Sequence, residues 1–106
     1  MFAAPRAFSR WSRFMGIERR RVLYTGRVQG VGFRYTAHRL AQGFSVSGFV
    51  RNLTDGNVEL LVEGEPARVK GFLEAIKSEM GHYIYEAHEE LEPAGNAPFH
   101  GFSIRY

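Results

Sequence analysis

The segment of residues 28–34, VQGVGFR, has the composition of an anion-binding loop. It follows a stretch with strand-like alternation and leads directly into one with helical periodicity. The first N–H groups of a helix have no partner within the helix, and the aligned peptide dipoles place partial positive charge there. Gly30 and Gly32 permit the backbone angles that turn successive N–H groups toward one point, so an anion is the natural occupant. Arg34 adds a planar donor that can hold two phosphate oxygens.

This pattern on its own leaves two interpretations open. Two glycines also make an ordinary tight turn between a strand and a helix, with Arg34 as a solvated helix residue. The segment has neither the Gly-Lys-Ser/Thr ending of a Walker A loop nor the GxGxxG spacing of a dinucleotide-binding loop. The residues predicted to bind an anion, through main-chain N–H groups and one guanidinium, are Gln29, Gly30, Val31, Gly32, Phe33 and Arg34.

A second candidate, Asn52, ends another strand-like stretch just before a turn signal at residues 54–57, TDGN. Its carboxamide offers a donor and an acceptor and can hold a water molecule in one orientation. An asparagine that merely caps the turn is the alternative interpretation. Asp55 is expected to be a hairpin residue, and the hydroxyl of Thr54 is expected to brace Asn52.

The elements that must position these residues follow from the apolar spacing. Strands are predicted at 21–28, 44–52, 58–64, 83–91 and 102–106, and helices at 33–43 and 66–80. Gly43 is expected to end the first helix. Val58, Leu60 and Val62 alternate with Glu59 and Glu63, which predicts one buried and one wet face for that strand. The order βαββαβ plus a short C-terminal strand predicts a ferredoxin-like α+β sandwich, an antiparallel sheet with both helices on one face.

Composition limits the class of protein. The 106 residues, 44% of them hydrophobic, fit one globular domain. No run of apolar residues approaches the roughly 20 needed to cross a bilayer, so we expect no membrane-spanning segment. There is no cysteine, and hence neither a disulfide framework nor a thiol nucleophile. The four histidines have no ligand spacing, so neither a metal nor a cofactor is expected, and the acidic residues at 89, 90 and 92 are expected to be solvated.

The positive charge is concentrated at the N-terminus. Residues 1–20 hold five arginines and one glutamate, whereas residues 21–106 hold nine basic and ten acidic side chains. The predicted folded domain, residues 21–106, therefore has no overall basic surface for nucleic acid. For residues 1–20 three interpretations remain: a disordered extension with the true start at Met15, an organelle-targeting peptide, or a segment that docks on the domain or on a partner.

Two long stretches carry a resemblance to a known family. The sequence VQGVGFR at 28–34, and the pattern GFVRNxxxGxV at 48–58 with a later glycine at Gly64, resemble the two signature stretches of the acylphosphatases. The similarity spans residues 21–106, and Tyr24 departs from the aliphatic residue that is usual before the first motif. The resemblance implies metal-independent hydrolysis of the carboxyl–phosphate bond of small acylphosphates, with Arg34 and the loop amides on the phosphate and Asn52 on the attacking water.

The resemblance also sets expectations about partners. They are a small acylphosphate as substrate, inorganic phosphate as product and inhibitor, no nucleic acid, no membrane, a monomer and a cytoplasmic location. Two other readings stay open. One is an RNA-binding module, although residues 47–50 match only a fragment of its RNP1 motif. The other is a non-catalytic domain that binds an anion or serves a larger carbamoyl-transfer system.

Overall fold

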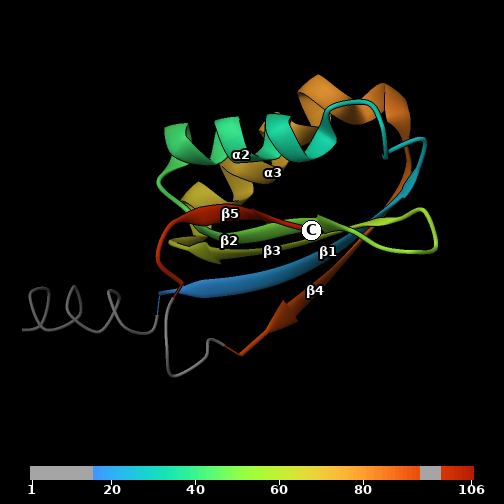
Figure 1. Cartoon of the computed structure of the whole chain (residues 1–106). Helices are drawn as coiled ribbons and strands as arrows, with labels where there is room; N and C mark the ends of the chain where they lie inside the picture. The colour runs from blue at the N-terminus through green and yellow to red at the C-terminus, as the bar shows by residue number, and fades with distance from the viewer. Residues whose placement is uncertain (1–15, 94–98) are drawn as a thin grey trace, which may run out of the picture.

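The computed structural model describes residues 16–93 and 99–106 of the chain (Figure 1). The elements of these residues are β1 (Glu18–Gly26), α2 (Phe33–Phe44), β2 (Ser47–Asn52), β3 (Val58–Gly64), α3 (Pro66–Met80), a 3₁₀ turn (Gly81–Tyr83), β4 (Ile84–Glu92) and β5 (Phe102–Arg105). Their order is βαββαβ plus a short last strand, as the sequence predicts. In this part of the chain, no helix is both long and apolar enough to span a membrane.

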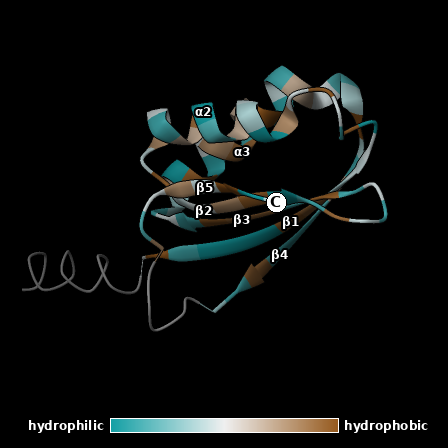
Figure 2. Ribbon diagram, viewed as in Figure 1, coloured by the Kyte–Doolittle hydropathy of each residue, from teal (hydrophilic) through white to brown (hydrophobic). Residues whose placement is uncertain are grey.

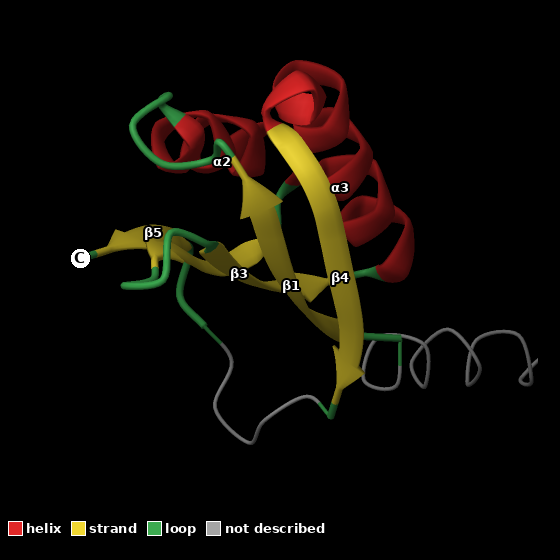
Figure 3. Ribbon diagram, turned by 90° about the vertical axis from the view of Figure 1, so that its right-hand side faces the viewer, coloured by secondary structure: helices red, strands yellow, loops and turns green. Residues whose placement is uncertain are grey.

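The five strands form one sheet in the order β4-β1-β3-β2-β5, and both helices pack on the same face of it (Figures 1 and 3). The order of the first four strands is that of a ferredoxin-like fold, which confirms the expected fold class. The sheet is not antiparallel throughout, however, because β5 pairs with β2 in parallel. The reason is topological: β5 reverses direction after β4 but joins the opposite edge of the sheet, and the strand at that edge, β2, runs the same way.

The core lies between the helices and the sheet. Val22, Tyr24 and Leu60 on the strands are buried against Phe33 of α2 and Phe72 of α3. The aromatic rings interlock, since the Phe72 ring lies 5.4 Å from that of Phe102 and the Tyr24 ring 4.9 Å from that of Phe33. The helical and strand periodicities of the sequence therefore identify the faces that are buried in the core. The burial of Phe33 also anchors the first residue of α2 directly beside the loop that precedes it.

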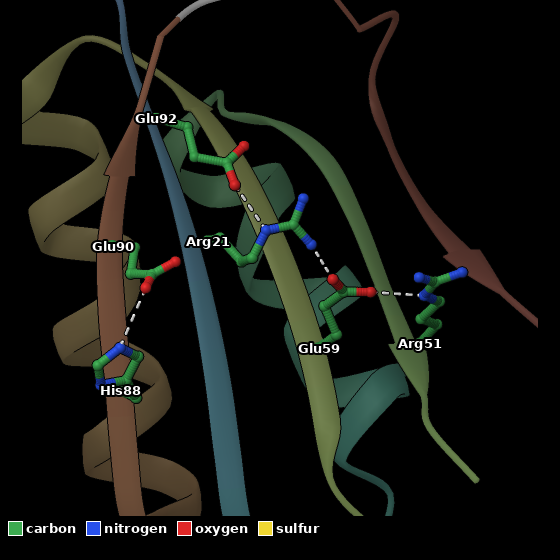
Figure 4. Close-up of polar contacts among 6 residues, drawn as sticks. All are labelled: Arg21, Arg51, Glu59, His88, Glu90 and Glu92. Carbon is green, nitrogen blue, oxygen red and sulfur yellow. Dashed lines mark hydrogen bonds and ion pairs between the residues drawn. The ribbon is translucent and has the colours of Figure 1, made fainter.

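The face of the sheet away from the helices corrects one expectation. Glu59 and Glu63 were expected on a wet strand face, yet they are only 7% and 4% exposed. Arg19 donates to Glu63 at 2.9 Å, and Arg51 donates to Glu59 at 2.5 Å. Arg21 bridges Glu59 and Glu92 across neighbouring strands (Figure 4). The aliphatic stems of the arginines cover the carboxylates, so this face is a layer of ion pairs rather than a solvated surface.

The charged layer begins within β1, whose first half is hydrophilic in Figure 2. Because β1 starts at Glu18, residues 18–20 of the expected N-terminal extension belong to the sheet. The three interpretations of that extension otherwise concern residues 1–15, which lie outside the described residues, as do residues 94–98 of the expected loop.

Gly43 does not end α2: the helix continues to Phe44, and Ser45 adopts the left-handed conformation, with φ 54°.

We predict that removing a buried Arg–Glu ion pair lowers stability far more than removing an exposed one. Glu63→Ala leaves the guanidinium of Arg19 without its partner in a mostly dry setting and is expected to lower the free energy of unfolding by about 2–3 kcal/mol. Glu65→Ala removes an exposed ion pair with Arg68 and should change the free energy of unfolding by less than about 0.5 kcal/mol. Urea denaturation of both variants measures the difference. Equal losses would show that the layer of ion pairs does not stabilise the fold.

Candidate active site

The loop between β1 and α2 presents unpaired main-chain donors. Gly30 and Gly32 have φ of 77° and 81°, in the left-handed region, and Gly32 is the residue that caps α2. No side chain caps this end of the helix, and its first turn contains no acidic residue. Within the described part of the chain, the N–H groups of Gly30, Val31 and Gly32 donate to no backbone acceptor. These amides are therefore available to an anion.

A cavity of about 240 Å³ lies beside this loop. It is lined by Val28, Gly30, Gly32, Phe33, Arg34, Tyr35, Asn52, Ile104 and Tyr106. Arg34 and Asn52, which come from the two separate signature stretches, thus share one cavity. Among the described residues no Asp, Glu or His side chain lines it, so its polar chemistry comes from amides, a guanidinium, a carboxamide and phenols.

Two larger hollows, of about 560 and 400 Å³, lie between α3 and strands β1 and β4. In the larger one Arg20, Lys70 and Lys77 stand among Glu18, Glu74 and Glu89, so its charges largely cancel. The larger hollow reaches the start of α3 at Pro66 and Ala67, but Pro66 has no N–H, and the N–H groups of Arg68 and Val69 donate to the carbonyl of Glu65. The smaller cavity is the better candidate because it joins the uncapped start of α2 to Arg34 and Asn52.

Arg34 lies in the first turn of α2 and faces this cavity. Its guanidinium carbon is 4.9 Å from the centre of the Tyr106 ring, a cation–π contact that holds the side chain at the cavity wall. Among the described residues Arg34 has no ion pair, in contrast to Arg39 of the same helix, which bonds Glu79 at 2.5 Å. The charge of Arg34 is therefore not neutralised by a neighbouring carboxylate.

Asn52 is the last residue of β2 and pairs with Val58 of β3. Its carboxamide lines the cavity and has no hydrogen bond to another described residue, so it can bind water. The expected brace from Thr54 is not formed, because no hydrogen bond joins the two side chains and Thr54 does not line the cavity. Asp55 is a hairpin residue, as expected, since its carboxylate accepts the N–H of Asn57 at 3.0 Å.

The remaining loop residues are placed differently. The carboxamide of Gln29 points away from the cavity and donates to the carbonyls of Leu53 and Asn57 in the β2–β3 hairpin. The side chain of Val31 packs against the core. The sequence did not point to Tyr35, Ile104 or Tyr106, although Tyr35 directly follows Arg34. The apolar alternation at 102–106 predicts a strand but not that Ile104 and Tyr106 line the site, because β5 reaches the site only through its parallel pairing with β2.

Beneath the loop, Tyr24 packs against Phe33. Burial raises the pKa of the Tyr24 hydroxyl far above its usual range, and the nearby carboxylate of Glu89 raises it further. Tyr24 therefore stays protonated at neutral pH and acts as a packing residue rather than as a proton donor or acceptor. Within the described residues, no group of three or more His, Cys, Asp or Glu side chains is placed to hold a metal ion.

Comparisons with known proteins point to one family. The acylphosphatase family model matches residues 20–104. An acylphosphatase of Yersinia pseudotuberculosis is 41% identical over 81 residues, which are 76% of this chain and 88% of that protein. An acylphosphatase of a Roseiflexus species is 40% identical over 90 residues, or 85% and 97% of the two chains. The crystal structure of acylphosphatase from Bacillus subtilis superposes with a TM-score of 0.77 at 34% identity, covering 84% of this chain and 99% of that one.

The matched region includes both signature stretches, and with them the β1–α2 loop and the end of β2. The loop amides, Arg34 and Asn52 therefore lie within the part of the chain that is shared with these relatives. The chain belongs to the acylphosphatase family, a family of hydrolases that act on acid anhydrides.

Proposed function

We propose that this protein hydrolyses the carboxyl–phosphate bond of acylphosphates to a carboxylate and inorganic phosphate. The loop amides and Arg34 hold the phosphoryl group, and Asn52 orients the attacking water. The single observation that carries this proposal is the convergence of three groups on one cavity of about 240 Å³: an uncapped helix start, an arginine and an asparagine.

The chemistry fits a cavity that has no acidic or imidazole side chain. The water oxygen forms a bond to phosphorus, the bond from phosphorus to the acyl oxygen breaks, and the electron pair leaves with the carboxylate. A carboxylate is a good leaving group and needs little help from a general acid. Phosphoryl transfer spreads charge over the equatorial oxygens, which preorganised donors stabilise. Asn52 cannot accept a proton at neutral pH, so the water's proton passes to a phosphate oxygen.

The same proposal covers the setting of the reaction. The substrate is a small acylphosphate, no metal or other cofactor takes part, and inorganic phosphate competes for the loop because it is the product. The near-neutral charge of residues 21–106 supports a small-molecule substrate rather than nucleic acid. We propose a monomer in the cytoplasm.

The central experiment mixes the purified protein with benzoyl phosphate in the presence of EDTA and follows the ultraviolet absorbance of the substrate. We expect rapid turnover that inorganic phosphate inhibits. Phosphate binding without turnover would indicate a non-catalytic anion-binding domain instead. Loss of turnover on addition of EDTA would contradict a metal-independent reaction.

We predict that Arg34→Gln lowers kcat/KM by at least about 10²–10³-fold. Removing one preorganised donor has this effect in other hydrolases, and here a positive charge is lost as well. Arg39→Gln is the matched control, since Arg39 lies further along α2 and pairs with Glu79 on the surface. Steady-state assays compare the two variants. An Arg34→Gln variant that keeps more than about a tenth of wild-type activity would refute the assignment.

For Asn52→Ala we predict a fall in kcat of about 10²-fold or more, because the water loses its orientation. The inhibition constant of phosphate should stay close to the wild-type value, since the loop amides and Arg34 are unchanged. Turnover assays and calorimetric phosphate titration give the two quantities separately. If binding weakens as much as turnover, Asn52 holds the phosphate rather than the water.

A further inference from the structure

We propose that Gln29 is a positioning residue that sets Asn52 in line with the phosphate loop. This inference rests on the proposed function, because it assigns Gln29 to the step in which Asn52 orients water. Gln29 precedes Gly30 in the loop, and its side chain reaches the β2–β3 hairpin, to which Asn52 leads. The residue therefore joins the two signature stretches directly.

The hydrogen bonds define this link. Nε2 of Gln29 donates to the carbonyl oxygen of Leu53 at 2.8 Å and to that of Asn57 at 2.9 Å. Both acceptors are carbonyls, so only the NH₂ end of the carboxamide can serve them, and its two hydrogens are both used. The orientation of the Gln29 carboxamide follows from its partners. Because the contact is partly buried, water competes with it only weakly.

The two acceptors stand where the β2–β3 pairing ends. Asn52 and Val58 form the last pair, and the N–H of Leu53 donates to the carbonyl of Asn57 at 2.8 Å. Gln29 therefore holds the residue that follows Asn52 and the residue that precedes Val58. With both sides of the hairpin fixed to the loop, the main chain of Asn52 cannot shift relative to the phosphate amides without breaking these bonds.

This link supplies the support that was expected from Thr54. Asn52 makes no side-chain hydrogen bond to another described residue, so its direction depends on its backbone and its packing. A displacement of about 1 Å at a reacting group can lower a rate 10²-fold. Gln29 does not line the cavity, and its carboxamide is occupied by the two hairpin carbonyls. It acts through Asn52.

The test uses the two glutamines of the chain as a matched pair. Gln29→Glu replaces the donating NH₂ with an oxygen that faces two carbonyls. Gln42→Glu makes the same change on the exposed face of α2, where Gln42 makes one long bond of 3.5 Å to the carbonyl of His38. We expect Gln29→Glu to lower kcat by about 10–100-fold and, because its new negative charge repels the anion, to weaken phosphate binding as well. Gln42→Glu should change neither.

A second variant separates this role from a role in folding. Gln29→Met keeps the length of the side chain and loses both hydrogen bonds without adding charge. We expect Gln29→Met to lower kcat by about 10–100-fold with the phosphate inhibition constant within about threefold of wild type, measured on protein that is folded by circular dichroism. Weakening of phosphate binding in step with kcat in this neutral variant would show that Gln29 shapes the loop itself and would overturn the inference.

A double-mutant cycle gives the decisive readout. In an Asn52→Ala background, Gln29→Glu should lower kcat by less than about twofold, because the group that it positions is already missing. If Gln29→Glu lowers kcat as much in the Asn52→Ala background as in the wild type, Gln29 does not act through Asn52. Failure of the proposed function would look different, since Asn52→Ala would then retain activity or the wild type would have none.

Discussion

At the start of α2, the free N–H groups have no hydrogen-bond partner among the described residues. Most helices use a serine, threonine or aspartate side chain to satisfy their first N–H groups. Here Gly32 occupies that position in the left-handed conformation, and no acidic side chain lies in the first turn. This leaves both the donors and the positive end of the dipole free for the anion that we propose to bind here. The rest of the structure keeps this end rigid, accessible and close to Asn52.

Rigidity comes from packing on one side and from hydrogen bonds on the other. Phe33, the first residue of α2, is 2% exposed and lies against Tyr24 of β1, so the helix start cannot move without opening the core. On the hairpin side, Gln29 connects the loop to the end of β2. In the reaction that we propose, donors held in this way do not have to reorient as charge develops on the phosphoryl group.

Local patterns in the sequence predicted the elements, the two helical faces, and the loop and asparagine that share the cavity. These features depend on residues close together in the chain. The features that the sequence did not reveal depend on pairing between distant segments. Glu59 looks like a surface residue until the register places Arg21 and Arg51 beside it. Likewise, Tyr106 enters the cavity wall only because β5 joins β2 in parallel. The end of α2 is a different, local case: glycine is generally favoured after a helix, yet the left-handed residue here is Ser45 and not Gly43.

The position of β4 at the border of the sheet has a further consequence. Its outer backbone groups face away from β1, and a row of such groups can recruit a strand from a neighbouring molecule. Four of its nine residues are glutamates: Glu86, Glu89, Glu90 and Glu92. Glu89 and Glu92 are paired with Arg20 and Arg21, which leaves Glu86 and Glu90 as the carboxylates of this strand without an arginine partner among the described residues. Like charges on two aligned copies repel one another, so these acidic side chains disfavour edge-to-edge pairing through β4.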